Sequence, residues 1–456
     1  MHGGEWGNLY RVITSWRVIL MLMRPFIADA AARRRGWKIA VAREDSRPAG
    51  ARKPRAKMSP QVVLLLAVHG LFAVANALSG TFVNVYLWKS AGDMSLIGRF
   101  ALAAQAVNAA TFFFAGKWVK EYDKMNCLRL GVAGSALFYL IVLLLERRAA
   151  DFVLLLGAVQ GMAGGFFWLS FNVVYFEVTD PDNRDRFNGW AGLLGSVSGM
   201  TAPWISGMII ARLGGLRGYR WVFGLSLAVF VIGVIASFFL KKRKVPGQYD
   251  WLYGFRKLFS EGDPWRRIVP ALAFQGVREG VFAFIIGLLV YIATENEQML
   301  GNYALITSAV GLGSFWLAGK LLTPKYRGAA MLIGAAAMSA VIVPFFWKVN
   351  YATLLLFGIG TALVFPLFTI PMTSSVFDWI GKDADSARHR VEYVVLREMA
   401  LNAGRIAALI VFILVIGRKA DPGTLNWLLF ATGSFPLLSW VMMRKLLARG
   451  TRFGAP

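Results

Sequence analysis

Long apolar stretches separated by short polar segments make up the chain from residue 60 onward. Most of them reach about 20 residues, which is the length that an α-helix needs to cross the hydrocarbon core of a bilayer. Glycine and proline interrupt several stretches, as helices in membranes tolerate. The pattern predicts twelve spanning helices, at about residues 61–88, 95–116, 128–145, 150–178, 187–212, 221–240, 268–293, 299–319, 328–347, 351–377, 393–416 and 424–443.

The segment before the first stretch has a different character. Residues 1–57 are rich in basic side chains, including the arginines at 33–35. Their apolar run, Val18–Ile27, is too short to span a bilayer, and no clear cleavage site of a signal peptide follows it. We predict a disordered cytoplasmic tail, and as a hypothesis we place the true start of translation at Met58.

The second half of the apolar region repeats the first at a shift of 203 residues, and no gap is needed across residues 101–117. The matching positions are Ala101 and Ala304, Leu102 and Leu305, Ala106 and Ala309, Val107 and Val310, Phe112 and Phe315, and Ala115-Gly116-Lys117 and Ala318-Gly319-Lys320. Such a duplication is typical of membrane proteins built from two similar bundles around a central path. We therefore predict an all-α polytopic membrane protein with two pseudo-symmetric six-helix bundles, at 58–240 and 268–446. A linker at 241–267 joins them, and a short tail at 447–456 ends the chain.

Composition indicates the solvent of most of the chain. Hydrophobic residues make up 57% of the 456 residues, charged residues make up 16%, and the mean hydropathy is +0.54. A soluble domain carries about 25% charged residues. We therefore predict a multi-pass protein of the cytoplasmic membrane, with the lipid bilayer as its surroundings.

The net charge of +25 would suit a nucleic-acid partner, but its distribution argues otherwise. Lysine and arginine concentrate in the loops after the second, fourth, sixth, eighth and tenth predicted helices and in both tails. This is the bias of cytoplasmic loops in membrane proteins. We expect no nucleic-acid partner and place both termini in the cytoplasm.

Residues that carry metal, redox or catalytic chemistry are sparse. Cys127 is the single cysteine, which excludes a disulfide framework and a thiolate metal site. The three histidines, His2, His69 and His389, are too scattered to suggest a metal cluster. No G-x-x-x-x-G-K-[ST] loop indicates nucleotide binding. We expect neither an enzyme, nor a cofactor, nor a metal site.

The segment between the two halves, from Lys241 to Arg267, is short and basic. Within it, Asp250–Phe259 combines aromatic, apolar and basic side chains, as an amphipathic helix on the inner leaflet would. A plain solvated linker fits the sequence equally well, so both interpretations stay open.

Ionisable residues inside the predicted spans gather on two helices of the second half. Arg278 and Glu279 lie on the seventh helix, and Arg397, Glu398 and Arg405 lie on the eleventh. Each charge in mid-membrane costs about 2.5–3.5 kcal/mol on insertion scales, so it should pair or face a wet cavity. Neighbours on a helix point about 100° apart. We therefore predict pairs across helices, Arg278 with Glu398 and Glu279 with Arg397.

Helical spacing collects these charges with polar neighbours on one face of each helix. The seventh helix contributes Gln275, Arg278, Glu279 and Phe282, and the eleventh contributes Glu398, Asn402 and Arg405. The alternative to a functional site is a buried ion-pair network that only holds helices together. We favour function, because buried pairs are poor stabilisers.

The spans of the first half carry weaker polar groups. His69 and Asn76 lie seven residues apart on the first helix, Gln105 and Asn108 lie three apart on the second, and Gln160 lies on the fourth. Each alone is more often an interhelical hydrogen bond than a ligand contact. The fourth helix is also rich in aromatic residues, for which packing is a more common role than a substrate wall.

Short motifs stand where the predicted helices meet the cytoplasm. Gly116 is followed by Asp123 and Lys124 after the second helix. Acids and arginines occur together at two further helix ends, as Glu177, Arg184 and Arg186 after the fourth helix and as Asp378, Arg388 and Arg390 after the tenth. The fifth helix carries four small or helix-bending residues at four-residue spacing, Gly195, Gly199, Pro203 and Gly207. That spacing suits close helix packing.

Twelve spans in a six-plus-six duplication, both ends inside and a basic central loop resemble the major facilitator superfamily over residues 60–446. The resemblance implies two bundles that open alternately to the two sides of the membrane. It also implies that Asp123 and Lys124 anchor an inner gate. The acid and arginine clusters after the fourth and tenth helices would then form ion pairs when the inside closes.

These observations predict a secondary active transporter of a small organic solute, an exporter or a sugar or metabolite porter, driven by H⁺ and acting as a monomer. Glu279 and Glu398 are the candidates for proton coupling, and Arg278 and Arg397 are their partners or an anchor for an anionic substrate group. The wider set of candidate substrate and coupling residues also includes Gln275, Asn402, Arg405, His69 and Asn76. The alternative is a transporter-like membrane sensor or assembly partner that no longer transports.

Overall fold

The computed structural model describes residues 59–178, 181–241, 247–380, 385, 388–418 and 421–450, so the predicted tail at 1–57 lies outside it. Twelve helices in these ranges are long and apolar enough to cross a membrane, which confirms the twelve predicted spans. The first six are α2 (Pro60–Ala91), α3 (Met94–Glu121), α4 (Lys124–Leu145), α5 (Val153–Val178), α6 (Pro181–Leu213) and α7 (Gly215–Phe238). The second six are α9 (Trp265–Thr294), α10 (Glu297–Leu321), α11 (Arg327–Ala340), α12 (Tyr351–Ile380), α14 (Arg390–Arg418) and α15 (Pro422–Gly450).

Polar side chains mark where several helices begin. Asp93, Asp123 and Asn296 occupy the N-cap positions of α3, α4 and α10, where each side-chain oxygen accepts a backbone N–H of the first turn. Such caps satisfy N–H groups that lack a partner inside the helix. Short 3₁₀ helices continue or precede two of the spans, at η2 (Glu146–Ala150), η3 (Pro324–Tyr326) and η4 (Val343–Phe346).

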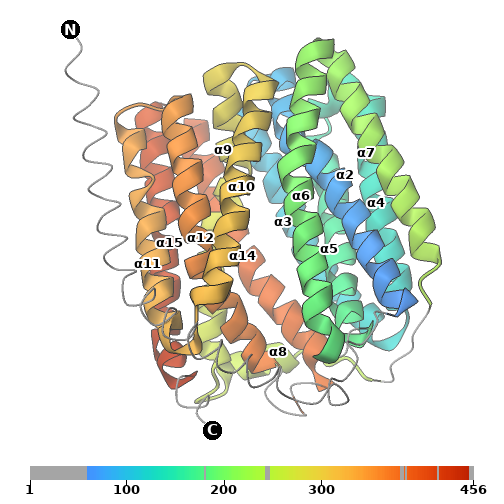
Figure 1. Cartoon of the computed structure of the whole chain (residues 1–456), viewed down its shortest axis with the longest axis vertical. Helices are drawn as coiled ribbons and strands as arrows, with labels where there is room; N and C mark the ends of the chain where they lie inside the picture. The colour runs from blue at the N-terminus through green and yellow to red at the C-terminus, as the bar shows by residue number, and fades with distance from the viewer. Residues whose placement is uncertain are drawn as a thin grey trace, which may run out of the picture.

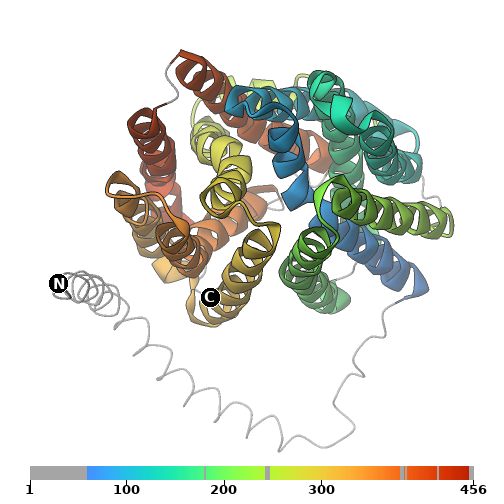
Figure 2. The ribbon, with the colours of Figure 1, turned by 90° about the horizontal axis from the view of Figure 1, so that it is seen from above.

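The helices form two groups of six, α2–α7 and α9–α15, which lie side by side when seen from above (Figure 2). The groups meet mainly along two pairs of helices, α3 with α14 and α6 with α10. The sequence repeat places Ala101 of α3 on Ala304 of α10. The two contacts are therefore pseudo-symmetric equivalents, as expected for a duplicated transporter fold.

The short helix α8 (Tyr253–Phe259) lies at one end of the bundle, which we call the linker end; the opposite end is the far end (Figure 1). At the far end α6 and α10 cross closely, as the position of Gly207 shows. A Cβ at Gly207 would lie 2.5 Å from the carbonyl oxygen of Glu297. The two helices diverge toward the linker end (Figure 1). There a Cβ at Gly195 would meet no other atom of the described residues within 4 Å. Close packing of the predicted glycine set thus holds at Gly207 and is wrong at Gly195.

The linker packs against the bundle where the structure describes it. The backbone N–H of Tyr249 donates to the carboxylate of Glu121 on α3, at 2.9 Å. Gly254 of α8 is buried, and a Cβ there would lie 3.1 Å from the Cβ of Leu396 on α14. The described part of the linker thus contacts the bundle, and the helix within it begins at Tyr253 rather than at the predicted Asp250.

Candidate functional site

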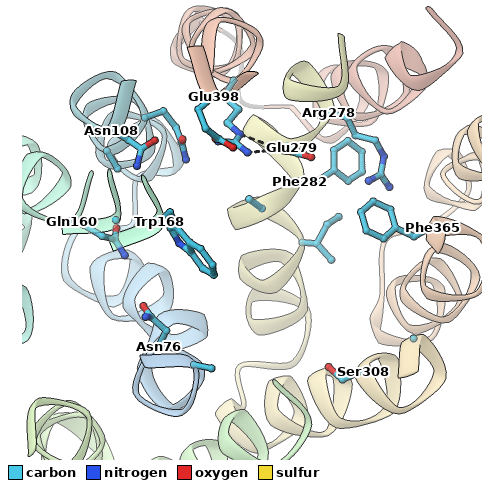
Figure 3. A pocket seen from close by; sticks show the side chains of 18 of the residues that line it. Asn76, Asn108, Gln160, Trp168, Arg278, Glu279, Phe282, Ser308, Phe365 and Glu398 are labelled. Atoms are coloured by element: carbon cyan, nitrogen blue, oxygen red, sulfur yellow. Dashed lines mark hydrogen bonds and ion pairs between the residues drawn. The ribbon is translucent and has the colours of Figure 1, made fainter. Parts of the chain in front are cut away.

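A cavity of about 1230 Å³ lies between the two groups of helices. Its walls come from α2, α3, α4 and α5 on one side and from α9, α10, α12 and α14 on the other. Figure 3 shows the amides of Asn76, Asn108 and Gln160 on one side and the arginine and aromatic rings of α9 and α12 on the other. A cavity of this size holds an organic molecule.

Glycines bring α9 and α14 into close contact beside this cavity. A Cβ at Gly276 would overlap the carbonyl oxygen of Leu401, and one at Gly404 would overlap that of Ala273. Gly280 also lies close to α14, since its Cβ would lie 2.7 Å from the carbonyl oxygen of Arg405. Small residues of this kind let helices in membranes approach at backbone distance. Residue 279 on α9 is therefore held beside residue 405 on α14.

Glu279 forms an ion pair with Arg405 at this crossing. The guanidinium donates to one carboxylate oxygen from Nε at 3.2 Å and from Nη2 at 2.7 Å. The other carboxylate oxygen accepts a hydrogen bond from Nε2 of Gln275, one turn earlier on α9, at 2.7 Å. Glu279 thus has partners for both oxygens while still lining the cavity.

The remaining charges pair differently from the sequence-based prediction. Arg397 donates to its chain neighbour Glu398 at 2.5 Å. The second oxygen of Glu398 lies 3.9 Å from Nη1 of Arg405, so Glu279 and Glu398 share that arginine. The predicted pairs of Arg278 with Glu398 and of Glu279 with Arg397 are wrong, because the close crossing presents Arg405 to Glu279 first.

Arg278 stands apart from this network. Its Nε and Nη2 are buried and have no hydrogen-bond partner among the described residues. The side chain is 8% exposed, lines the cavity, and lies with its guanidinium carbon 4.6 Å from the ring centre of Phe282. Figure 3 shows it beside Phe282 and Phe365, with its guanidinium directed away from Glu398.

A chain of hydrogen bonds runs from the ion pairs into the first group of helices. Nη1 of Arg405 donates to the amide oxygen of Asn402 at 3.2 Å, and Nδ2 of Asn402 donates to Asn108 of α3 at 3.0 Å. Asn108 in turn donates to the carbonyl of Gly161 on α5 at 3.3 Å. Asn402 is fully buried, so this chain is a solvent-shielded polar contact between the two halves.

The predicted polar residues of α2 also reach the cavity. His69 stacks on Phe171 with ring centres 4.6 Å apart, and its Nδ1 is buried without a partner in the described part of the chain. Asn76 donates to the carbonyl of Phe72 on its own helix. On α5 the aromatic residues divide, since Phe167 is fully buried by packing whereas Trp168 lines the cavity.

The predicted gate residues are only partly brought together. Asp123 caps α4, and Lys124 beside it is buried. Asp378 forms an ion pair with Arg327 of α11 at 2.6 Å. Arg388 is exposed at the linker end, and Arg390 begins α14. The side chains predicted to lie beyond the fourth helix, those of Glu177, Arg184 and Arg186, fall outside the described part of the structure.

Two ion pairs between the halves were not predicted from the sequence. At the linker end Lys120 of α3 pairs with the buried Glu392 of α14. At the far end Lys89 of α2 donates to Glu297 of α10 at 2.7 Å, and the hydroxyl of Tyr219 donates to the same oxygen at 3.0 Å. The sequence contains one weak indication of these pairs, namely residues of opposite charge at the ends of helices that belong to different halves.

Metal-binding groups are not clustered in the part of the chain that the structure describes. No set of three or more histidine, cysteine, aspartate or glutamate side chains there could hold a metal ion. Cys127 is buried as a free thiol.

Comparison with known proteins finds one matching family profile and two similar sequences among those compared. The sequence profile described as Major Facilitator Superfamily matches residues 64–409. The chain is 41% identical over 363 residues to "Uncharacterized protein YqgE" of Bacillus subtilis (strain 168), covering 79% of this chain and 84% of that protein. It is 44% identical over 167 residues to "Uncharacterized protein in sodM 3'region" of Geobacillus stearothermophilus, covering 37% of this chain and 78% of that protein.

Solved structures with a similar fold are transporters. A bacterial homologue of the iron transporter ferroportin, in an outward-facing state, aligns with a TM-score of 0.61 at 14% identity, over 85% of this chain and 99% of that chain. The human organic anion transporter MFSD10 aligns with a TM-score of 0.57 at 15% identity, over 84% of this chain and 100% of that chain. At such identities the likeness concerns the fold alone. The profile match across most of the sequence, carried on two six-helix groups around a central cavity, shows that this chain belongs to the Major Facilitator Superfamily.

Proposed function

We propose that this chain is a secondary active transporter that moves a small organic solute across the cytoplasmic membrane in exchange or together with H⁺. The linker end is the cytoplasmic end, because the basic loops gather there. The cavity between the halves is the substrate site, and the halves rock about it to expose it to each side in turn. The divergence of α6 and α10 toward the linker end supports an inward-open arrangement.

The observation that carries the proposal is the sharing of Arg405 by Glu279 and Glu398 beside the cavity. A carboxylate that loses its proton in such a place gains an arginine partner, and one that gains a proton releases it. Arg405 is also bonded to Asn402, which contacts the first half through Asn108. Protonation at the site therefore changes a contact between the halves, which is what coupling requires.

The lining of the cavity supports an organic molecule as the transported solute. Aromatic rings and arginines dominate the wall formed by α9, α12 and α14. Such a wall suits an organic molecule with polar groups better than a bare cation, which prefers oxygen or nitrogen ligands. The fold neighbour MFSD10 is named as an organic anion transporter, which agrees with this preference.

The test is proton movement in liposomes that contain the purified full chain and a trapped pH-sensitive dye. Addition of a transported solute from a metabolite panel should change the internal pH, and Glu279→Gln and Glu398→Gln should abolish that change. Glu146→Gln is the matched control, because Glu146 pairs with Arg220 on the exposed far end. Coupled transport that survives in both cavity variants would exclude these carboxylates. Absence of any solute movement in the wild type would favour a sensor or assembly role instead.

A further inference from the structure

Arg278 is a buried cation whose guanidinium forms no ion pair with an acidic side chain of the described residues. Its side chain is 8% exposed, and its Nε and Nη2 have no partner in the described residues. The carboxylate next to it in sequence, Glu279, is directed to Gln275 and Arg405 instead. A buried charge without a partner is strongly unfavourable, so its retention calls for a role beyond packing.

The charges that line the cavity leave an excess of the same sign. Three arginines and two glutamates line it, namely Arg278, Arg397, Arg405, Glu279 and Glu398. Both glutamates are occupied by the other two arginines. One positive charge therefore remains when the carboxylates are ionised, and it is located at Arg278.

Aromatic side chains surround this cation. The ring of Phe282 lies under the guanidinium at 4.6 Å, and Phe357 stacks on Phe282 with ring centres 5.8 Å apart. Phe365 lines the same part of the cavity, beside Arg278 in Figure 3. A ring face offsets part of the cost of burying the charge but leaves the N–H donors of the guanidinium unsatisfied. A planar carboxylate satisfies two of them at once.

We propose that Arg278 binds the anionic group of the transported solute, and that the apolar or aromatic body of that solute lies against Phe282 and Phe365. The substrate class is thus an organic anion, such as an aromatic or aliphatic carboxylate. This inference rests on the proposed function and deepens it, because the pocket is the same. It assigns a role to Arg278 that is separate from the proton site, since no ion pair of Arg278 with Glu279 or Glu398 is present in the described residues.

The test measures binding rather than transport. The full chain in detergent is heated with 2-naphthoate, benzoate or octanoate, and with the neutral amide of each acid as its twin. A ligand of the folded state raises the melting temperature. We expect at least one carboxylate to raise it where its amide does not. Arg278→Met should weaken that binding about 10- to 100-fold, as expected for loss of a charged hydrogen bond, and Arg278→Lys should weaken it less.

Stability without ligand separates a binding role from a structural one. Arg278→Met should leave the unliganded melting temperature unchanged or raise it, because it removes an unpaired buried charge. Arg220→Met, at the exposed far-end pair, is the control and should keep the response to the carboxylate. A lower melting temperature in Arg278→Met, equal stabilisation by the amides, or no stabilisation by any carboxylate overturns the proposal. Since no gradient is used, a failure of coupled transport leaves this result untouched.

Discussion

Arg405 on α14 donates two hydrogen bonds to one carboxylate oxygen of Glu279 on α9, from Nε at 3.2 Å and from Nη2 at 2.7 Å. The third nitrogen of the same guanidinium donates to Asn402, which binds Asn108 in the other half. A single arginine thus connects a candidate proton site with the interface of the two halves. We expect neutralisation of Glu279 to withdraw the charge that orients Arg405, with an effect that reaches the interface through two hydrogen bonds.

Asn402→Leu should break this connection. Asn402 is fully buried and uses both ends of its amide, so the change leaves Asn108 and Arg405 each without one partner. We expect a loss of about 1–3 kcal/mol in stability, measured as a lower melting temperature. We also expect uncoupling, in which the solute is still transported but the accompanying proton movement is lost. Asn426→Leu is the control, because Asn426 is also buried but bonds to the carbonyl of Phe345 within the second half and does not line the cavity; it should lose stability and keep the coupling. An Asn402→Leu protein as stable and as tightly coupled as the wild type would contradict the role given to this contact.

Gly280→Ala tests how the crossing of α9 and α14 positions the ion pair. The added Cβ would lie 2.7 Å from the carbonyl oxygen of Arg405, so the helices must move apart. Overpacking of this kind costs about 1–3 kcal/mol, and the separation should also weaken the pair between Glu279 and Arg405. Melting temperature and the solute-driven proton signal both report the change. Gly287→Ala, on the same helix, adds a Cβ at an ordinary 3.8 Å from Leu300 and should behave as the wild type.

The spans and the two-bundle architecture could be predicted from the sequence, because hydrophobic length and the internal repeat are local properties of the chain. The concentration of charge on α9 and α14 could be predicted in the same way. Which charges pair could not, since that depends on how each helix is rotated and how closely two helices approach. The distances at Gly276, Gly280 and Gly404 decide it. The spacing of Gly276 and Gly280, four residues apart around Glu279, was the available signal for the close crossing.

The ion pairs that join the halves could not be predicted from the sequence, for a different reason. Lys120 and Glu392 are separated by 272 residues, and Lys89 and Glu297 by 208. Each residue alone is an ordinary charge at the end of a helix, and nothing near it in the sequence names its partner. Only the packing of the two groups of helices shows that α3 meets α14, and that the end of α2 lies beside the start of α10.

Glu392→Gln should loosen the linker end. Glu392 is buried, pairs with Lys120 across the interface, and accepts the backbone N–H of Asp250 from the linker. Loss of its charge should favour separation of α3 and α14 at this end by about 1–2 kcal/mol. The ratio of molecules with these helix ends apart to molecules with them in contact should then rise roughly 5- to 30-fold. The measurement is the rate at which an impermeant maleimide labels Thr307→Cys, in the cavity wall, from the linker side.

The control for that experiment is Lys117→Gln on the same helix. Lys117 lies 3.8 Å from Glu121 within α3 and is partly exposed, so its loss does not touch the interface. Cys127 is buried and should not contribute to the labelling. Equal labelling rates in Glu392→Gln and in the parent protein would show that this pair does not hold α3 and α14 together at the linker end.

Glu297→Gln should act in the opposite direction, at the far end. The Glu297 carboxylate accepts hydrogen bonds from Lys89 and Tyr219 of the first half and is 8% exposed. An amide keeps one acceptor but loses the charge that holds the lysine, so the far end should open in a larger share of molecules. Labelling of Thr307→Cys should then become faster from the far side and slower from the linker side, since one cavity cannot be open to both. Glu295→Gln changes an exposed acid two residues away and should alter neither rate; a faster rate from both sides in Glu297→Gln would indicate local unfolding instead of alternating access.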